Sequence, residues 1–82
     1  MAATIITPEQ CRAARAWLNW KQEDLAREAQ TSLSTVRDFE KGRRNPYPNN
    51  ARAIAGAFER AGVILTFTPA GAAKGVERSQ DP

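Results

Sequence analysis

The side chains best suited to recognising another molecule gather between residues 31 and 44, in the stretch TSLSTVRDFEKGRR. Hydroxyl, carboxylate and guanidinium groups surround two large apolar residues, Val36 and Phe39, which stand three positions apart. Residues at this spacing share one face of a helix, so the stretch predicts a helix with two core anchors and a polar outer face. Such a face offers hydrogen bonds to a binding partner.

Positive charge accumulates beside this polar stretch. Five bases and two acids between residues 37 and 52 give a net charge of +3, which equals the formal charge of the whole 82-residue chain. A solvated surface is the ordinary interpretation of a charge cluster. Its position next to a polar helix favours a polyanion as the partner.

Composition argues against several other kinds of site. The chain has no histidine, which removes Ser-His-Asp and Cys-His catalysis and every histidine-based metal site. The single cysteine, Cys11, cannot form an internal disulfide and fits a reducing compartment. No apolar run approaches the roughly 20 residues of a membrane span, and the first ten residues do not resemble a signal peptide. We therefore expect a cytoplasmic protein that is not an enzyme and uses no metal or cofactor.

A first helix is expected after Thr7, which can cap it, with Pro8 at the first helical position and Gln10 completing a capping box. Arg15 falls on the apolar face of this helix, where a charge is unexpected.

A second helix is expected over about 22–29, and a third over about 33–41 with Ser32 as its cap and Gly42 as its left-handed end. Two short helices joined by a tight turn are typical of a helix-turn-helix. Simple core packing of two helices is the alternative.

The C-terminal part changes character after a fourth helix, which is expected to begin at a cap on Asn49 or Asn50. The segment 63–67, VILTF, is rich in β-branched and aromatic residues and predicts a strand. The chain beyond residue 69 is small, polar and glycine-rich, and is expected to be flexible. We expect the strand to pair with its mate in a second copy, with a hairpin to the segment near Val76 as the alternative.

The stretch WKQEDLAREAQTSLSTVRDFEKGRRNP resembles the phage repressor and Cro-like (XRE-type) helix-turn-helix family. The resemblance extends over about residues 7–62. The residues that carry it are Gln22, Glu23, Leu25, Ala26, Ser32, Val36, Phe39, Glu40, Gly42 and Arg43. It implies an all-α, four-to-five-helix domain like that of the lambda repressor. The segment 63–67 adds a short C-terminal β-strand or hairpin to this expected fold. The resemblance also implies binding to double-stranded DNA, usually as a dimer.

The resemblance assigns roles to matching positions. Residues in the positions of the family's base readers are Leu33, Ser34, Arg37 and Asp38. Candidate phosphate contacts are Gln22, Ser32, Lys41, Arg43, Arg44, Asn49 and Asn50. Arg15 and Glu40 match an internal salt bridge, with two unrelated solvated charges as the alternative. The chain departs from the family at Gln30, where glycine is usual, and at Thr31, where an apolar residue is usual.

These observations predict a DNA-binding domain over 1–62 and a strand with a flexible tail, serving dimerisation, over 63–82. The expected dimer strand consists of Val63, Ile64, Leu65, Thr66 and Phe67. We expect a dimeric transcriptional repressor that binds a near-palindromic operator. The alternatives are the antitoxin of a toxin–antitoxin pair, which would also bind its toxin, and a protein-interaction module that has lost DNA binding.

Overall fold

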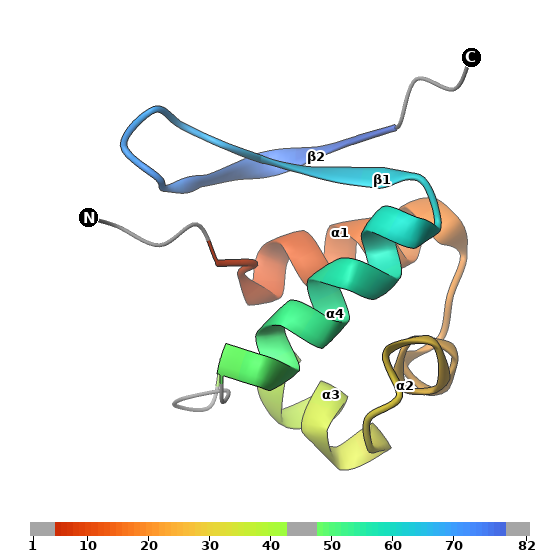
Figure 1. Ribbon diagram of the computed structural model, residues 1–82. Helices are drawn as coiled ribbons and strands as arrows, with labels where there is room; N and C mark the ends of the chain where they lie inside the picture. Colours follow the sequence, from red (N-terminus) through yellow and green to blue (C-terminus); the bar gives the residue numbers. More distant parts are fainter. Residues whose placement is uncertain (1–4, 43–47, 79–82) are drawn as a thin grey trace.

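The computed structural model describes residues 5–42 and 48–78, which form four helices followed by a hairpin (Figure 1). The elements in chain order are α1 (Pro8–Leu18), α2 (Gln22–Ala29), α3 (Leu33–Glu40), α4 (Pro48–Arg60), β1 (Val63–Phe67) and β2 (Ala73–Arg78). The hairpin lies across α1 and α4, whereas α2 and α3 lie on the opposite side of the domain (Figure 1). The expected fold class is therefore confirmed, with the hairpin as its C-terminal element. No helix in the described ranges is long and apolar enough to cross a membrane.

The ends of the first three helices follow the expected signals. The Gln10 amide donates to Thr7 Oγ1 at 3.2 Å and the Thr7 amide donates to Gln10 Oε1 at 3.1 Å, which forms the capping box. Ser32 caps α3 by accepting a hydrogen bond from the Thr35 amide at 3.0 Å. Gly42 follows α3 with φ of +71°, in the left-handed region where glycine is unstrained.

The expected cap of the fourth helix is wrong. Since α4 begins at Pro48, Asn49 and Asn50 lie within its first turn instead of before it. Proline suits the first helical position because it lacks the amide N–H that this position leaves unpaired. The two asparagines therefore remain near the N-terminal end of α4, without acting as its cap.

The core forms where α4 packs against the first three helices. Leu25 of α2 and Val36 of α3 are fully buried, and so are Ile54 and Phe58 of α4. Trp20, between α1 and α2, stacks on Phe58 with 5.8 Å between ring centroids. The other buried apolar residues are Ile6, Cys11, Ala14, Ala26, Ala29, Phe39, Ala51, Ala57 and Val63. Val36 and Phe39, the two anchors expected in α3, thus attach the helix to this core.

The pairing of β1 differs from the interpretation favoured above. Its partner is β2 of the same chain, in antiparallel register from Val63 opposite Arg78 to Phe67 opposite Ala73. Residues 73–78 of the expected flexible tail are thus a strand. The connection is not loose, because the Thr68 amide donates to the Ala72 carbonyl at 2.8 Å and Gly71 closes the turn with φ of +93°. Val63, the first residue of β1, is buried in the core beside the helices.

Gln10 attaches the hairpin to α1. Its side-chain Nε2 donates to the carbonyl oxygens of Thr66 and Gly75, at 2.9 and 3.0 Å. These two residues face each other across the hairpin, next to an irregularity in register between Thr66 and Phe67. Because Gln10 Oε1 also accepts from the Thr7 amide, one buried side chain joins the start of a helix to both strands.

Gln30, which stands where the family usually has glycine, adopts the left-handed conformation with φ of +56°. A residue with a Cβ is strained there by about 1–2 kcal/mol. We therefore expect Gln30→Gly to stabilise the domain by about 1 kcal/mol in chemical denaturation. Asn19→Gly is the matched control, since Asn19 has the same conformation with φ of +57° and asparagine tolerates it better. A Gln30→Gly variant no more stable than wild type would contradict the strain.

Candidate nucleic-acid interface

Glu40, the last residue of α3, carries a buried carboxylate that joins α3 to α1. Arg15 Nε lies 2.6 Å from Glu40 Oε2, and Arg15 Nη2 donates to Oε1 at 2.8 Å, which makes a bidentate pair. The Glu40 side chain is only 4% exposed and that of Arg15 is 20% exposed, so water screens this pair less than a surface pair. Arg15 also donates through Nη1 to the Trp20 carbonyl at 3.1 Å.

Two further donors complete the surroundings of this carboxylate. The Cys11 thiol donates to Glu40 Oε2 at 3.0 Å, and Gln22 Nε2 donates to Oε1 at 3.1 Å. Gln22 is the first residue of α2, so the carboxylate of one helix reaches the beginning of the helix before it. Glu40 therefore fixes α3 against both α1 and α2, which sets the geometry of the helix-turn-helix.

The protonation states follow from these contacts. Burial alone would raise the pKa of the Glu40 carboxyl, but hydrogen bonds from Arg15, Cys11 and Gln22 outweigh it and hold the pKa below its ordinary value. Burial and the bond to Glu40 raise the pKa of the Cys11 thiol, so the thiol stays protonated and able to donate. The hydrogen bonds that Arg15 itself donates to Glu40 raise the pKa of the Arg15 guanidinium. The charged pair is the stable form at neutral pH.

The outer face of α3 carries the four expected base readers. Ser34, Arg37 and Asp38 are exposed, and Leu33 is half-buried at the start of the helix. Within residues 5–42 and 48–78, neither Arg37 nor Asp38 belongs to an ion pair. Both side chains are exposed on the outer face of α3.

Hydroxyl groups cluster at the beginning of α3. Ser32 Oγ lies 3.1 Å from Ser34 Oγ and 2.8 Å from Thr35 Oγ1, and it also accepts the Thr35 amide. These contacts restrict the side chain of Ser34 before any partner arrives. A restricted hydroxyl loses less entropy on binding than a freely rotating one.

The expected phosphate contacts lie in or directly beside three different helices, α2, α3 and α4. Gln22 is half-buried at the start of α2, Lys41 is exposed directly after α3, and Asn49 is exposed in the first turn of α4. Ser32 is exposed before α3, and Asn50 is half-buried beside Asn49. The predicted contacts of Arg43 and Arg44 fall outside the described residues and stay predictions.

Arg12 is a charged residue at this surface that the sequence patterns did not single out. It lies on α1, is exposed, and donates through Nη1 to the backbone oxygen of Glu40 at 2.6 Å. Its place next to the end of α3 results from the packing of α1 on α3, and no short sequence motif encodes that packing.

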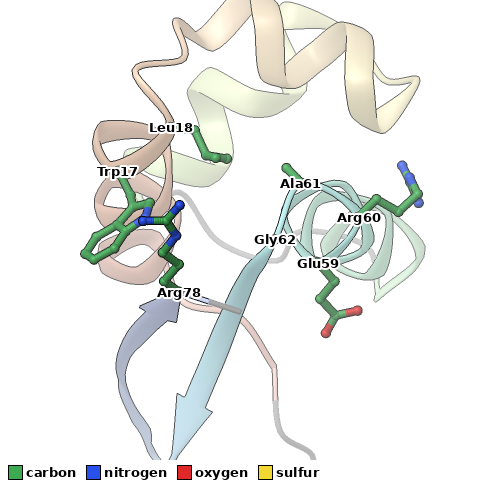
Figure 2. A pocket seen from close by; sticks show the side chains of 7 residues that line it. All are labelled: Trp17, Leu18, Glu59, Arg60, Ala61, Gly62 and Arg78. Carbon is green, nitrogen blue, oxygen red and sulfur yellow. The ribbon is translucent and has the colours of Figure 1, made fainter. Parts of the chain in front are cut away.

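A hollow of the surface lies away from the outer face of α3. It is an open groove of about 700 Å³ between the C-terminal ends of α1 and α4, and Figure 2 shows Trp17 and Arg78 on one side of it with Ala61 and Gly62 on the other. None of the expected base readers lines this groove. In the described ranges, no group of three acidic or cysteine side chains could hold a metal ion.

Comparison with known proteins agrees with this arrangement. A family model described as helix-turn-helix matches residues 12–62, from the middle of α1 to the end of α4. The match confirms the resemblance to the XRE-type, Cro-like family that the sequence predicted. That family is a DNA-binding domain without enzymatic activity. No curated protein matches the chain significantly.

The buried carboxylate predicts a specific loss of stability. Glu40→Ala leaves Arg15 without its partner and should lower the free energy of unfolding by about 3–5 kcal/mol. For a domain of this size, that lowers Tm by more than about 10 °C. A Glu40→Ala variant that melts within a degree or two of wild type would show that the pair contributes nothing.

The pH dependence gives an independent check. Because the folded state lowers the pKa of Glu40, its contribution is complete above the ordinary value of 4.5 and is lost as the pH falls through the lower, folded-state pKa. The Tm difference between wild type and Glu40→Gln should therefore shrink as the pH falls below 4.5. A difference that stays constant from pH 7 to pH 3 would contradict the assignment.

Proposed function

This chain belongs to the XRE-type helix-turn-helix family, and from that premise we propose that it is a sequence-specific, dimeric transcriptional repressor. That it is a DNA-binding regulator of the XRE type follows from the family itself. The observation that carries the proposal is the division of α3 into two faces. Val36, Phe39 and Glu40 are buried and attach the helix to the domain, while Ser34, Arg37 and Asp38 are exposed on the outside.

The outer face of α3 supplies the chemistry to read base edges in a major groove. Leu33 suits the methyl group of thymine, and Ser34 can donate to or accept from several bases. Asp38 can accept a hydrogen bond from cytosine N4, and Arg37 can donate two to guanine. A helix with this mixture of groups discriminates among sequences instead of binding any duplex equally.

Contacts to the phosphates would hold α3 in register without reading sequence. The charged contributors are Lys41, Arg43 and Arg44, which follow α3 in the chain. The neutral contributors are Gln22, Ser32, Asn49 and Asn50, which stand at the N-terminal ends of α2, α3 and α4. Helix N-termini favour phosphate because their amide groups are unpaired and their dipoles are positive.

A second copy of the chain would complete the repressor through the hairpin. β1 is paired with β2 along one edge only, and the hairpin lies on the side of the domain opposite α2 and α3 (Figure 1). Two copies joined antiparallel along the other edge of β1 would be related by a two-fold axis perpendicular to the sheet. That axis places both α3 helices on the same side, as two half-sites about 34 Å apart require. Val63, Leu65 and Phe67 would lie on the core side of the joined sheet, with Ile64 and Thr66 on its outer face.

The antitoxin alternative has one observation in its favour. Trp17 is 54% exposed beside the groove between α1 and α4, and an exposed tryptophan is a common anchor in protein interfaces. A toxin could occupy that groove while α3 remains on DNA. Co-purification with the product of a neighbouring gene would identify such a partner. The other alternative, an interaction module without DNA binding, would give no shift of a random duplex at low salt.

Substitutions on α3 and after it should affect DNA binding in different ways. Arg43→Ala should weaken binding to every sequence and reduce the dependence of log K on log salt by about 0.9, because one phosphate contact is lost. Ser34→Ala and Asp38→Ala should change the preferred base at one position by about 1–3 kcal/mol. Selection from a randomised DNA pool followed by fluorescence titration measures both effects. Equal losses on operator and random DNA for the Ser34 and Asp38 variants would reject them as base readers.

The dimer interface is tested by charging one exposed apolar position on the hairpin and one beside the groove separately. Ile64 is 42% exposed on β1, so Ile64→Lys should leave the monomer folded but lower the dimer fraction in analytical ultracentrifugation and weaken operator binding. Trp17→Lys is the matched variant, since Trp17 is also exposed but lies on α1. Dissociation by Trp17→Lys and not by Ile64→Lys would move the interface from the hairpin to the groove.

A further inference from the structure

Arg12 has more hydrogen-bonding capacity than the fold uses. A guanidinium carries five N–H donors in a rigid, planar arrangement, and one of those on Nη1 binds the Glu40 backbone oxygen. In the described parts of the chain the two ion pairs are Arg15 with Glu40 and Arg27 with Asp24, so Arg12 has no acidic partner there. Among residues 5–42 and 48–78, no group accepts a hydrogen bond from the other four donors of this exposed cation.

The position of this guanidinium is restricted. Its bond to the Glu40 oxygen holds it at the C-terminal end of α3, and Lys41 follows Glu40 directly in the chain. Arg12 and Lys41 are both exposed. Two cationic residues therefore stand beside the C-terminal end of α3, the helix that carries the expected base readers.

Among the described residues, no acidic side chain forms an ion pair with either of these two cations. The carboxylate of Glu40 is buried and its oxygens accept from Arg15, Cys11 and Gln22. Asp38 is exposed three residues before Lys41, yet no ion pair joins them in the described chain. Two exposed cations beside the same helix end favour the approach of an anion there.

A capping role for Arg12 accounts for part of this arrangement. An arginine at a helix C-terminus commonly binds the last carbonyl groups and interacts favourably with the helix dipole. That role uses the single bond to Glu40 and requires nothing of the other four donors. It therefore predicts an effect on stability alone, which distinguishes it from a role in binding.

We infer that Arg12 is a DNA-phosphate ligand, and that together with Lys41 it forms a phosphate subsite at the C-terminal end of α3. The inference rests on the proposed function and extends it to α1, an element to which no DNA contact has been assigned above. The planar fork of the guanidinium can donate two parallel hydrogen bonds to one phosphate while its Nη1 stays on Glu40. The phosphate backbone would thereby meet α1 and α3 at the same place, which fixes the angle of α3 in the groove.

Salt-dependent binding separates a phosphate ligand from a helix cap. The affinity of the full chain for a selected operator and for a random duplex is measured against KCl concentration for wild type, Arg12→Ala, Arg12→Lys and Arg78→Ala. Arg12→Ala should reduce the slope of log K against log salt by about 0.9 and weaken both duplexes by the same factor. Arg12→Lys should keep most of the slope because the charge remains. Arg78→Ala is the matched control, since Arg78 is an exposed arginine at the end of β2, on the far side from α3 (Figure 1).

The possible outcomes are distinct. An Arg12→Ala variant that melts at a lower temperature but keeps the wild-type slope would overturn the inference and leave Arg12 as a cap. A slope reduced equally by Arg78→Ala would also overturn it, because the effect would then reflect net charge alone. Wild-type protein without salt-dependent binding would refute the proposed function itself. If Arg12→Ala does not fold, Arg12→Gln replaces it, since an amide can still donate to the Glu40 oxygen without carrying charge.

Discussion

The arrangement of α1, α2 and α3 depends on one buried carboxylate. A carboxylate taken out of water must recover its lost hydration through fixed donors, and Glu40 obtains them from Arg15, Cys11 and Gln22. These donors come from two helices, so only one relative placement of the three elements satisfies the charge. Apolar packing alone would allow neighbouring placements at small cost, whereas an unsatisfied carboxylate would not.

This constraint explains how a short helix can hold its outer face at a defined angle. α3 has eight residues, too few for a stable isolated helix in water. Val36 and Phe39 attach it to the core, and Glu40 adds directional bonds at its end. Within the described part of the chain, the exposed side chains of α3 form no hydrogen bond to the core, and Ser34 contacts its neighbour Ser32. Substitutions at these exposed positions can therefore change which DNA sequence α3 contacts while the helix stays in place.

Local and family signals predicted much of the fold and part of the site. Thr7 with Gln10 and Ser32 with Thr35 act within one helical turn, so the sequence reports them directly. The connection through β2 was harder to predict, because the segment 73–78, AKGVER, has a single large apolar residue and its pairing depends on Gln10, more than 50 residues away. Arg12 was overlooked for a similar reason, since its bond to Glu40 exists only once α1 has packed on α3.

The bonds of Gln10 to Thr66 and Gly75 also bear on the order in which the domain forms. They join positions that are 56 and 65 residues apart in the chain. Contacts of long sequence separation slow folding because a large loop must close before they are gained. During synthesis the helix pair with its recognition face emerges first, and the hairpin follows it. The side-chain amide of Gln10 on α1 therefore lacks its two hydrogen-bond acceptors in the hairpin until β2 has been synthesised.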